Sequence, residues 1–231
     1  MRVAGVDSCR GGWLAVTYDT DTGQLSPRAH LSFMALLESI PEAAAIAVDM
    51  PIGLSEDGPR RCDIEARKVL GPRRSSVFPA PDPRVLFAPT WWEAEQRSRA
   101  LTGKGISRQS FAICRKVAEV NWAMQWESQA RVFEIHPEVC FWALANRRPM
   151  TFRKTWPEGY DERVALLETA FAMPLWSREE ARDVARPAAP DDLLDAVAGA
   201  WTARRLVAGV AERLPAEPAV DRRGLRMEIV F

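Results

Sequence analysis

A short apolar run, Ala44–Val48, ends at Asp49 and is stopped by Pro51 and Gly53. A continuous apolar segment of this length between turn-forming residues is typical of a strand that is buried on both faces. Such a strand needs helices on both sides of its sheet, which is the arrangement found in α/β proteins. The run therefore favours a layered α/β fold in which a carboxylate lies at the end of a core strand.

The segments around this run follow the order that a mixed sheet requires. Arg2–Asp7 and Gly12–Tyr18 have strand character and flank a turn cluster at Cys9–Gly12, which predicts a β-hairpin. The further elements expected, in chain order, are a strand over Leu25–Leu31, a helix over Phe33–Ile40 capped by Ser32, a strand over Arg131–His136, helices over Glu138–Ala145 (after Pro137), Asp161–Ala172 and Asp191–Arg213, and a tail strand over Met227–Phe231. This order predicts hairpin strands first and parallel strands after a helical crossover.

From Ser55 to about Ser107 the periodicity weakens, and proline and arginine become frequent. We expect residues 55–129 to be an insertion within a single domain that spans residues 1–231, because no internal repeat or interdomain linker divides the chain. Within this insertion, Ser107 is placed to cap a helix that runs to about Glu127. Arg60, Arg67 and Arg74 are spaced so that they would share one helix face.

The chain has 31 basic and 31 acidic residues and a formal net charge of zero. Proteins that bind nucleic acid nonspecifically usually carry a positive excess, so any such role here depends on local clusters of charge. The cysteines, Cys9, Cys62, Cys114 and Cys140, form no CxxC pair, which favours free thiols over disulfides or a zinc site. Because we find no secretory leader and no apolar run long enough to span a bilayer, we expect a cytoplasmic protein without a membrane partner.

Acidic residues recur where the expected strands and helices end or begin. Asp7 ends the first strand, Asp49 ends the buried strand, Glu134 lies in the later apolar strand, and Asp192 and Asp195 open the last helix. The last two would share a helix face, with Cβ atoms about 5–6 Å apart. Grouped carboxylates repel one another and are costly to bury unless a cation lies between them. Mg²⁺ or Mn²⁺ suits carboxylate oxygens, and two such ions about 3.5–4 Å apart can support phosphodiester cleavage.

Several of these residues also have a simpler structural interpretation. Asp7 could accept hydrogen bonds in the turn that follows it, Asp192 could cap its helix, and Glu134 could face outward on its strand. Asp49 is harder to explain in this way, because it directly follows a wholly apolar strand. The acidic positions together are more specific for a catalytic site than any one of them.

Basic residues are concentrated in the expected insertion and provide candidates for binding a phosphate backbone. The candidates are Arg73, Arg74, Lys104, Arg108 and Lys116. The simpler interpretation of these residues is a solvated charged surface. His136, which precedes a proline, is more typical of a structural hydrogen-bond donor than of a catalyst.

Seven blocks of sequence, in order from about Gly5 to Arg205, resemble a family of largely uncharacterised bacterial and archaeal proteins described as predicted RNase H-like nucleases. The blocks are GVDSCRGGW, VDMPIGL, RRCDIEARKVLG, SSVFPAP, GKGIS, EIHPEVCFWAL and DDLLDAVAGAWTARR. The resemblance implies an RNase H-like fold whose acidic positions are Asp7, Asp49, Glu134, and Asp192 or Asp195. This chain has Ser8 and Cys140 where the family pattern usually has glycine and a smaller polar residue.

These observations predict a metal-dependent phosphodiester hydrolase, namely a nuclease that acts on DNA or RNA. Asp7 would bridge two metal ions, Asp49 and Glu134 would each bind one, and Asp195 with Asp192 would complete the cluster. Two alternatives stay open. An actin-like phosphotransferase or ATPase shares the hairpin start with an aspartate on the first strand, although it needs two such domains. A nucleic-acid-binding relative without catalysis would fit the neutral charge, although it would not need the carboxylates.

Overall fold

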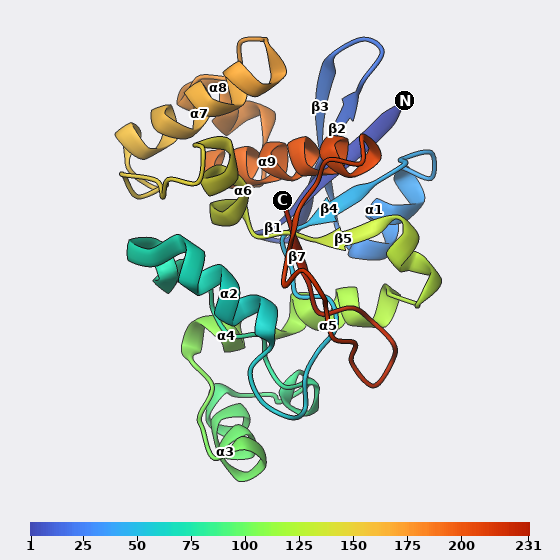
Figure 1. Cartoon of the computed structure of the whole chain (residues 1–231), viewed down its shortest axis with the longest axis vertical. Helices are drawn as coiled ribbons and strands as arrows, with labels where there is room; N and C mark the ends of the chain where they lie inside the picture. Colours follow the sequence, from blue (N-terminus) through green and yellow to red (C-terminus); the bar gives the residue numbers. More distant parts are fainter.

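The computed structural model describes residues 1–231 and shows a five-stranded mixed sheet between helices (Figure 1). The strand order is β3-β2-β1-β4-β5. Strand β1 pairs antiparallel with β2 and parallel with β4, while β2 and β3 are antiparallel and β4 and β5 are parallel. The strands are β1 (Arg2–Cys9), β2 (Gly12–Asp19), β3 (Gln24–His30), β4 (Ile46–Val48) and β5 (Val132–Glu134). The expectation of an α/β fold with a mixed sheet that begins with a hairpin is confirmed.

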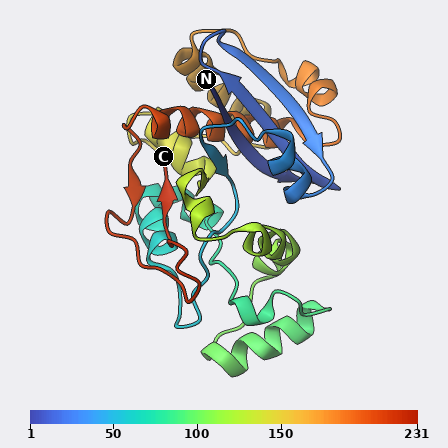
Figure 2. The ribbon, with the colours of Figure 1, turned by 90° about the vertical axis from the view of Figure 1, so that its right-hand side faces the viewer.

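Helices cover both faces of this sheet. Residues alternate between the two faces along each strand, and both faces carry apolar side chains that the helices bury. Val3, Val16 and Ala47 belong to the apolar cluster that includes helices α6, α7 and α9, whereas Val6 and Val48 pack with α1 and α5. Figure 2 shows the two layers from the side. The helices are α1 (Phe33–Ser39), α2 (Arg61–Leu70), α3 (Trp91–Thr102), α4 (Arg108–Ala112), α5 (Cys114–Ala123), α6 (Pro137–Leu144), α7 (Pro157–Phe171), α8 (Arg178–Val184) and α9 (Pro190–Val207). None of them combines the length and the apolar character needed to cross a bilayer.

The segment that was expected to be an insertion connects the parallel strands β4 and β5. It contains α2 to α5 and three short 3-10 helices, Gly71–Ser76, Pro83–Val85 and Glu127–Ala130. Helix α3 lies far from the sheet (Figures 1 and 2). The expected helix from Ser107 to Glu127 does begin at a Ser107 cap, where the Ser110 N–H donates to Ser107 Oγ at 3.0 Å. It is interrupted at Ile113 and ends at Ala123, so the prediction of one long helix is wrong.

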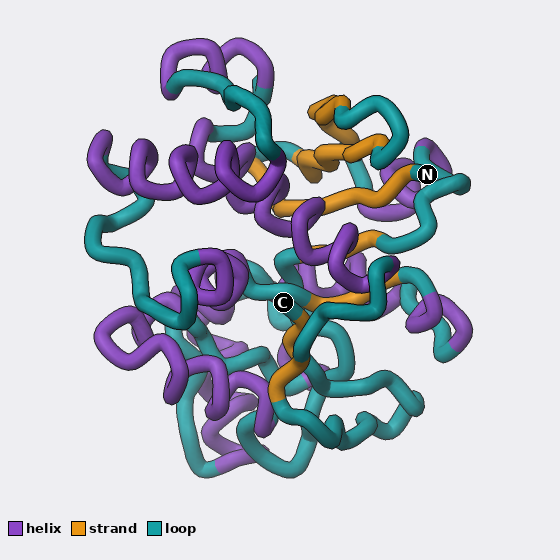
Figure 3. The backbone as a smooth tube through the Cα atoms, turned by 45° about the horizontal axis from the view of Figure 1, so that its top comes forward, coloured by secondary structure: helices purple, strands orange, loops and turns teal.

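The chain after α9 differs from the sequence expectation. Helix α9 ends at Val207 rather than near Arg213, because Gly209 takes a left-handed conformation (φ +70°) that helices commonly use to terminate. Arg213–Leu214 then forms strand β6, which pairs antiparallel with β7 (Ile229–Val230). The strand expected over Met227–Phe231 is therefore shorter (Figure 3). A bridge joins Val230 to Ile135 beyond β5.

Helix α9 lies unusually close to strand β1, because two glycines face each other at the contact. A Cβ atom added at Gly5 would lie 1.9 Å from the carbonyl oxygen of Ala196 and 2.1 Å from the backbone nitrogen of Ala200. A Cβ atom added at Gly199 would lie 2.9 Å from the Cα of Gly5. The approach of the helix to the sheet therefore depends on the absence of side chains at both positions.

We predict that Gly5→Ala lowers the free energy of unfolding by at least about 3 kcal/mol, the upper end of typical overpacking costs. The added methyl group would meet backbone atoms, which cannot move aside as a flexible side chain can. Urea unfolding of the purified variant measures this loss. Gly199→Ala is the matched control and should lose less, because its contacts are longer and alanine is favoured over glycine within a helix by up to about 1 kcal/mol. Equal losses in the two variants would contradict the proposed role of Gly5.

Candidate active site

A cavity of about 500 Å³ opens where strands β1, β4 and β5 end. The carboxyl ends of parallel strands are the usual place for a ligand in α/β sheets. The sheet contributes Ser8, Asp49 and Glu134, and helix α9 contributes Asp195. The remaining walls come from the start of α6, the crossover segment and the loop before α7, which supply His136, Glu138, Arg60, Asp63, Arg73, Phe78, Arg153, Lys154 and Thr155 among others. Residues from distant parts of the sequence therefore meet in one cavity.

Asp7, Asp49 and Asp195 are gathered by the contact between α9 and β1. Asp7 lies two residues after Gly5 and hence on the same face of the strand, and Asp195 lies one helical turn before Gly199. Val6 and Val48 are in register on neighbouring strands and pack on the opposite face, so Asp49, which follows Val48, also faces α9. The packing that brings the two glycines together thus brings the three carboxylates to one side of the sheet, near enough for the charges of Asp49 and Asp195 to act on Asp7.

The three carboxylates resist ionisation because they are crowded into a poorly hydrated place. Burial raises the pKa of Asp7 well above its ordinary value, and the charges of Asp49 and Asp195 raise it further. Burial and the charge of Asp195 raise the pKa of Asp49 to about 8. Burial also raises the pKa of Asp195, and Lys154 opposes this effect.

Lys154 is the cation that the protein itself places among these carboxylates. Its Nζ donates to Asp195 Oδ2 at 2.6 Å and lies 3.4 Å from Asp191 Oδ2. The carboxylate of Asp195 in turn raises the pKa of Lys154 above its ordinary value. Lys154 lies on the loop between α6 and α7, and nothing in the local sequence pattern indicated that it would reach the acidic cluster.

Glu134 does not join the three aspartates but forms a separate buried network with Arg60. Arg60 Nη1 and Nη2 donate to the two oxygens of Glu134 at 2.7 and 2.6 Å, and Nη2 also donates to Asp63 at 2.6 Å. The Ile52 N–H donates to Glu134 as well, at 2.6 Å. Glu134 is in register with Val48 and so lies on the opposite face of the sheet from Asp49. Burial raises the pKa of Glu134 to about 7, while Arg60 lowers it.

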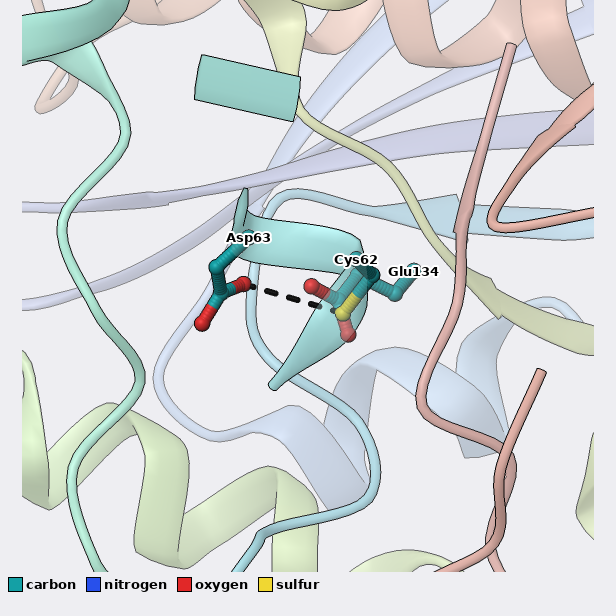
Figure 4. Close-up of side chains that lie close together, drawn as sticks. All are labelled: Cys62, Asp63 and Glu134. Atoms are coloured by element: carbon teal, nitrogen blue, oxygen red, sulfur yellow. Dashed lines mark hydrogen bonds between the residues drawn. The ribbon is translucent and has the colours of Figure 1, made fainter. Parts of the chain in front are cut away.

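Cys62, Asp63 and Glu134 are the set of three potential ligand residues whose ligand atoms all lie within 4.8 Å of one another (Figure 4). The guanidinium group of Arg60 already binds both carboxylates of this set. Burial raises the pKa of the Cys62 thiol, which favours its protonated form. The protonated thiol binds metals poorly, because the thiolate is the metal ligand. The set is therefore a neutralised structural network rather than a good metal site.

The remaining acidic candidate, Asp192, caps helix α9. Its Oδ2 accepts a hydrogen bond from the Ala189 N–H at 2.9 Å. Burial raises the pKa of Asp192 to about 6, and the bond from Ala189 lowers it. Neither Asp192 nor Asp7 lines the cavity, whereas Asp195 and Asp49 do, and Asp192 differs from Asp7 in that it is only partly buried. Between the two alternatives that the sequence left open, the geometry favours Asp195 as the member of the cluster.

The predicted basic residues are dispersed, and only Arg73 lines the cavity with the carboxylates. Arg74 is exposed outside the cavity, and Lys104 borders a different hollow beside α3. The guanidinium of Arg108 lies over the ring of Trp91 at 4.2 Å, and Lys116 pairs with Glu119 at 3.3 Å. The sequence did not predict that Arg153, from the loop before α7, would line the cavity.

The expectation that Arg60, Arg67 and Arg74 share an exposed helix face is wrong. Helix α2 starts after Arg60 and ends at Leu70, so the three residues are not on one helix. Arg60 is buried, and Arg67 Nη1 donates to the Val77 carbonyl at 2.6 Å. A pairing of Arg60 with Asp63 was visible in the sequence as opposite charges three residues apart. His136 Nε2 lies 3.3 Å from the Ser76 carbonyl oxygen, in keeping with a structural role.

The three aspartates fit a divalent cation by the chemistry of their donor atoms. Carboxylate oxygens are the ligands that Mg²⁺ and Mn²⁺ prefer. Asp7 accepts a hydrogen bond from the Ser8 N–H at 2.6 Å. Asp195 has Lys154 as its partner. Lys154 is a monovalent cation, and a divalent ion would lower the repulsion among the three carboxylates further.

These features define an α/β protein with an acidic cluster beside a cavity at the ends of its parallel strands. The chain matches the model of the family described as "Protein of unknown function (DUF429)" over residues 5–220. Because this match covers most of the 231 residues, the protein belongs to that family. The expected membership of an uncharacterised family is thereby confirmed. No curated protein matches the chain, and neither does any solved structure.

We predict that Arg60→Ala lowers the free energy of unfolding by about 3–5 kcal/mol, because removal of one partner leaves buried carboxylates uncompensated. Urea unfolding measures the change. Arg61→Ala is the matched control, because Arg61 pairs with Glu65 on the exposed side of α2, and exposed substitutions of this kind usually stay within about 0.5 kcal/mol. A loss in Arg60→Ala no larger than that in Arg61→Ala would show that the network does not stabilise the fold.

The raised pKa of Asp49 predicts how the stability of the metal-free protein depends on pH. The folded state holds this proton up to about pH 8, whereas an unfolded aspartate releases it near a pKa of about 3.9. Stability from this group is therefore complete below pH of about 4 and is lost as the pH rises to about 8. In EDTA, Asp49→Asn should lose less stability over this window and exceed the wild type at pH 8 by about 1 kcal/mol or more.

Unfolding curves at several pH values test this prediction. Asp183→Asn is the control, because Asp183 is exposed on α8 and pairs only with a neighbouring arginine on the surface. It should keep the pH dependence of the wild type. An identical pH dependence in Asp49→Asn would show that Asp49 ionises normally.

Proposed function

We propose that this protein is a metal-dependent phosphodiester hydrolase, a nuclease with an RNase H-like fold. The convergence of Asp7, Asp49 and Asp195 beside the cavity carries the proposal. Three carboxylates with raised pKa values are costly to keep together, and a bound divalent cation would offset their repulsion. The mixed sheet with its hairpin start and the seven resembling sequence blocks support the RNase H-like assignment.

Asp7, Asp49 and Asp195 would hold Mg²⁺ or Mn²⁺, which supplies an activated water and stabilises negative charge on the phosphate. In the reaction, a water molecule gives up a proton as its oxygen bonds to phosphorus, the bond to one ester oxygen breaks, and the leaving oxygen takes up a proton. The close packing of α9 on β1 keeps Asp7 and Asp195 in a fixed relation, as catalysis by oriented groups requires.

Glu134 has a different role in this proposal from the one that the sequence predicted. Because both of its oxygens bind Arg60, Glu134 would anchor the crossover segment under the cavity rather than bind a metal ion. Lys154, which binds Asp195, also lines the cavity and would supply positive charge near a phosphate held there.

We predict that the wild-type protein hydrolyses DNA or RNA oligonucleotides in the presence of Mg²⁺ or Mn²⁺ and that EDTA stops the reaction. Asp195→Asn and Asp7→Asn should each lower the rate at least about 100-fold, because a metal ligand supports several kcal/mol of charge stabilisation. Gel analysis of end-labelled oligonucleotides measures the rates.

Asp183→Asn is the control for a loss of acidic charge away from the site and should keep the wild-type rate. Calorimetric titration with Mg²⁺ provides an independent measurement, in which Asp195→Asn should bind the ion more weakly. Absence of hydrolysis with both metals, or wild-type rates in Asp195→Asn, would refute the proposed function.

A further inference from the structure

The cavity contains two arginines that the chemistry of hydrolysis leaves without a role. Arg73 and Arg153 both line it. Most carboxylates of the cavity pair with other cations, since Glu134 binds Arg60 and Asp195 binds Lys154, whereas Asp49 has no ion-pair partner. The polar contact of Arg73 is instead to a backbone carbonyl, and the contact of Arg153 is to the ring of Trp156. Both guanidinium groups therefore have donors left for a ligand.

A hydrogen bond connects the two segments that carry these arginines. Arg73 Nε donates to the Met150 carbonyl at 2.7 Å, which ties the 3-10 helix Gly71–Ser76 to the loop that carries Arg153. This bond uses the Nε–H and leaves the terminal nitrogens of Arg73 free. The planar guanidinium group matches a phosphate, to which it can donate two parallel hydrogen bonds.

An aromatic side chain lies beside these cations. Phe78 lines the cavity although 41% of it is exposed, so its ring is accessible to a ligand. Any nucleic-acid base can stack on such a ring, because every base has an aromatic face. Acidic groups for hydrolysis, guanidinium groups for a phosphate and a ring for a base thus share one cavity, and together they suit a nucleotide next to a scissile bond.

The size of the cavity limits how much nucleic acid it admits. Its volume of about 500 Å³ falls within the range of about 300–1,000 Å³ that small-molecule sites have. A cavity of this size has room for about one nucleotide unit.

Three of the basic residues that the sequence singled out do not extend the cavity into a track for a strand. Arg108 is stacked on Trp91, Lys116 is paired with Glu119, and Lys104 borders a different hollow. A nucleotide extruded from the middle of a strand would need its backbone held on both sides. A strand end needs only the cavity.

We propose that the cavity binds the terminal nucleotide of a single strand, with its phosphate on Arg73 and Arg153 and its base on Phe78. This inference rests on the proposed function, since it assigns a substrate class to the same site. A free nucleotide shares the chemistry, and the experiment separates the two sources. All binding is measured in EDTA, where no hydrolysis takes place, so that binding is decided independently of activity.

The first measurement is calorimetric binding of adenosine 5′-monophosphate and of adenosine. The nucleotide should bind at least about tenfold more tightly, because charge-assisted hydrogen bonds to phosphate are strong. Arg153→Ala and Phe78→Ala should each weaken nucleotide binding about tenfold. Arg73→Lys, which keeps the charge and loses the planar donor pair, should bind less tightly than the wild type. Arg182→Ala is the control, because Arg182 is exposed on α8, and it should bind as the wild type does.

The thermal stability of each variant shows whether it folds. Arg153 is exposed, so Arg153→Ala should unfold at the wild-type temperature even if a change at Arg73 disturbs the link to Met150. Equal affinity for nucleotide and nucleoside, or wild-type affinity in folded Arg153→Ala, would overturn the assignment of the phosphate site.

The second measurement compares a linear single-stranded DNA with a covalently closed circle of the same sequence by fluorescence anisotropy. The linear strand should bind at least about tenfold more tightly, and Arg153→Ala should remove the difference. Equal binding of circle and linear strand would overturn the assignment to strand ends in favour of an extruded nucleotide. Binding of adenosine 5′-monophosphate with no binding of either DNA would overturn it in favour of a free nucleotide.

The two proposals fail in different ways. If the binding pattern holds and no oligonucleotide is hydrolysed with Mg²⁺ or Mn²⁺, the terminal-nucleotide site stands and the nuclease activity falls. If circular and linear DNA are hydrolysed equally, the nuclease activity stands and the terminal-nucleotide site falls.

Discussion

The contact between Gly5 of strand β1 and Gly199 of helix α9 determines where the acidic side chains of this protein lie. Because neither residue has a side chain, the helix backbone reaches the sheet backbone. Asp7 follows on the same face of the strand and Asp195 precedes by one turn on the helix, so the distance between two carboxylates is set by the packing of two glycines. A larger residue at either position would separate the helix from the sheet and the acidic groups from each other.

The protein compensates its buried carboxylates with its own cations in two separate places. Arg60 binds Glu134 and Asp63 beneath the cavity, and Lys154 binds Asp195 and Asp191 beside it. The first network is almost wholly buried and has hydrogen bonds in several directions, which is the condition under which a buried ion pair is tolerated. The second leaves the carboxylates of Asp7 and Asp49 with raised pKa values, and this imbalance is what a divalent cation would relieve.

The net charge of the chain is zero, so its capacity to bind a phosphate depends on where its basic residues lie. Arg60 and Arg67 hold the crossover segment together, Lys116 pairs with Glu119, and Arg108 lies over Trp91. Arg73 and Arg153, in contrast, line the cavity and face a small volume. Charge placed in this way favours recognition of one phosphate group over nonspecific binding along a phosphate backbone.

Local patterns in the sequence determined the hairpin, the buried strand that ends at Asp49, the caps at Ser32 and Ser107 and the helix that begins at Pro137, because turns, caps and short periodic runs depend on neighbouring residues. They also singled out the acidic positions. Only the tertiary structure decided that Glu134 lies on the opposite face from Asp49, because a strand alternates its faces and its register is set by its partner. The partners Arg60 and Lys154 likewise come from segments far from Glu134 and Asp195 in the chain. Such pairs depend on how helices and loops pack, and no local sequence pattern encodes them.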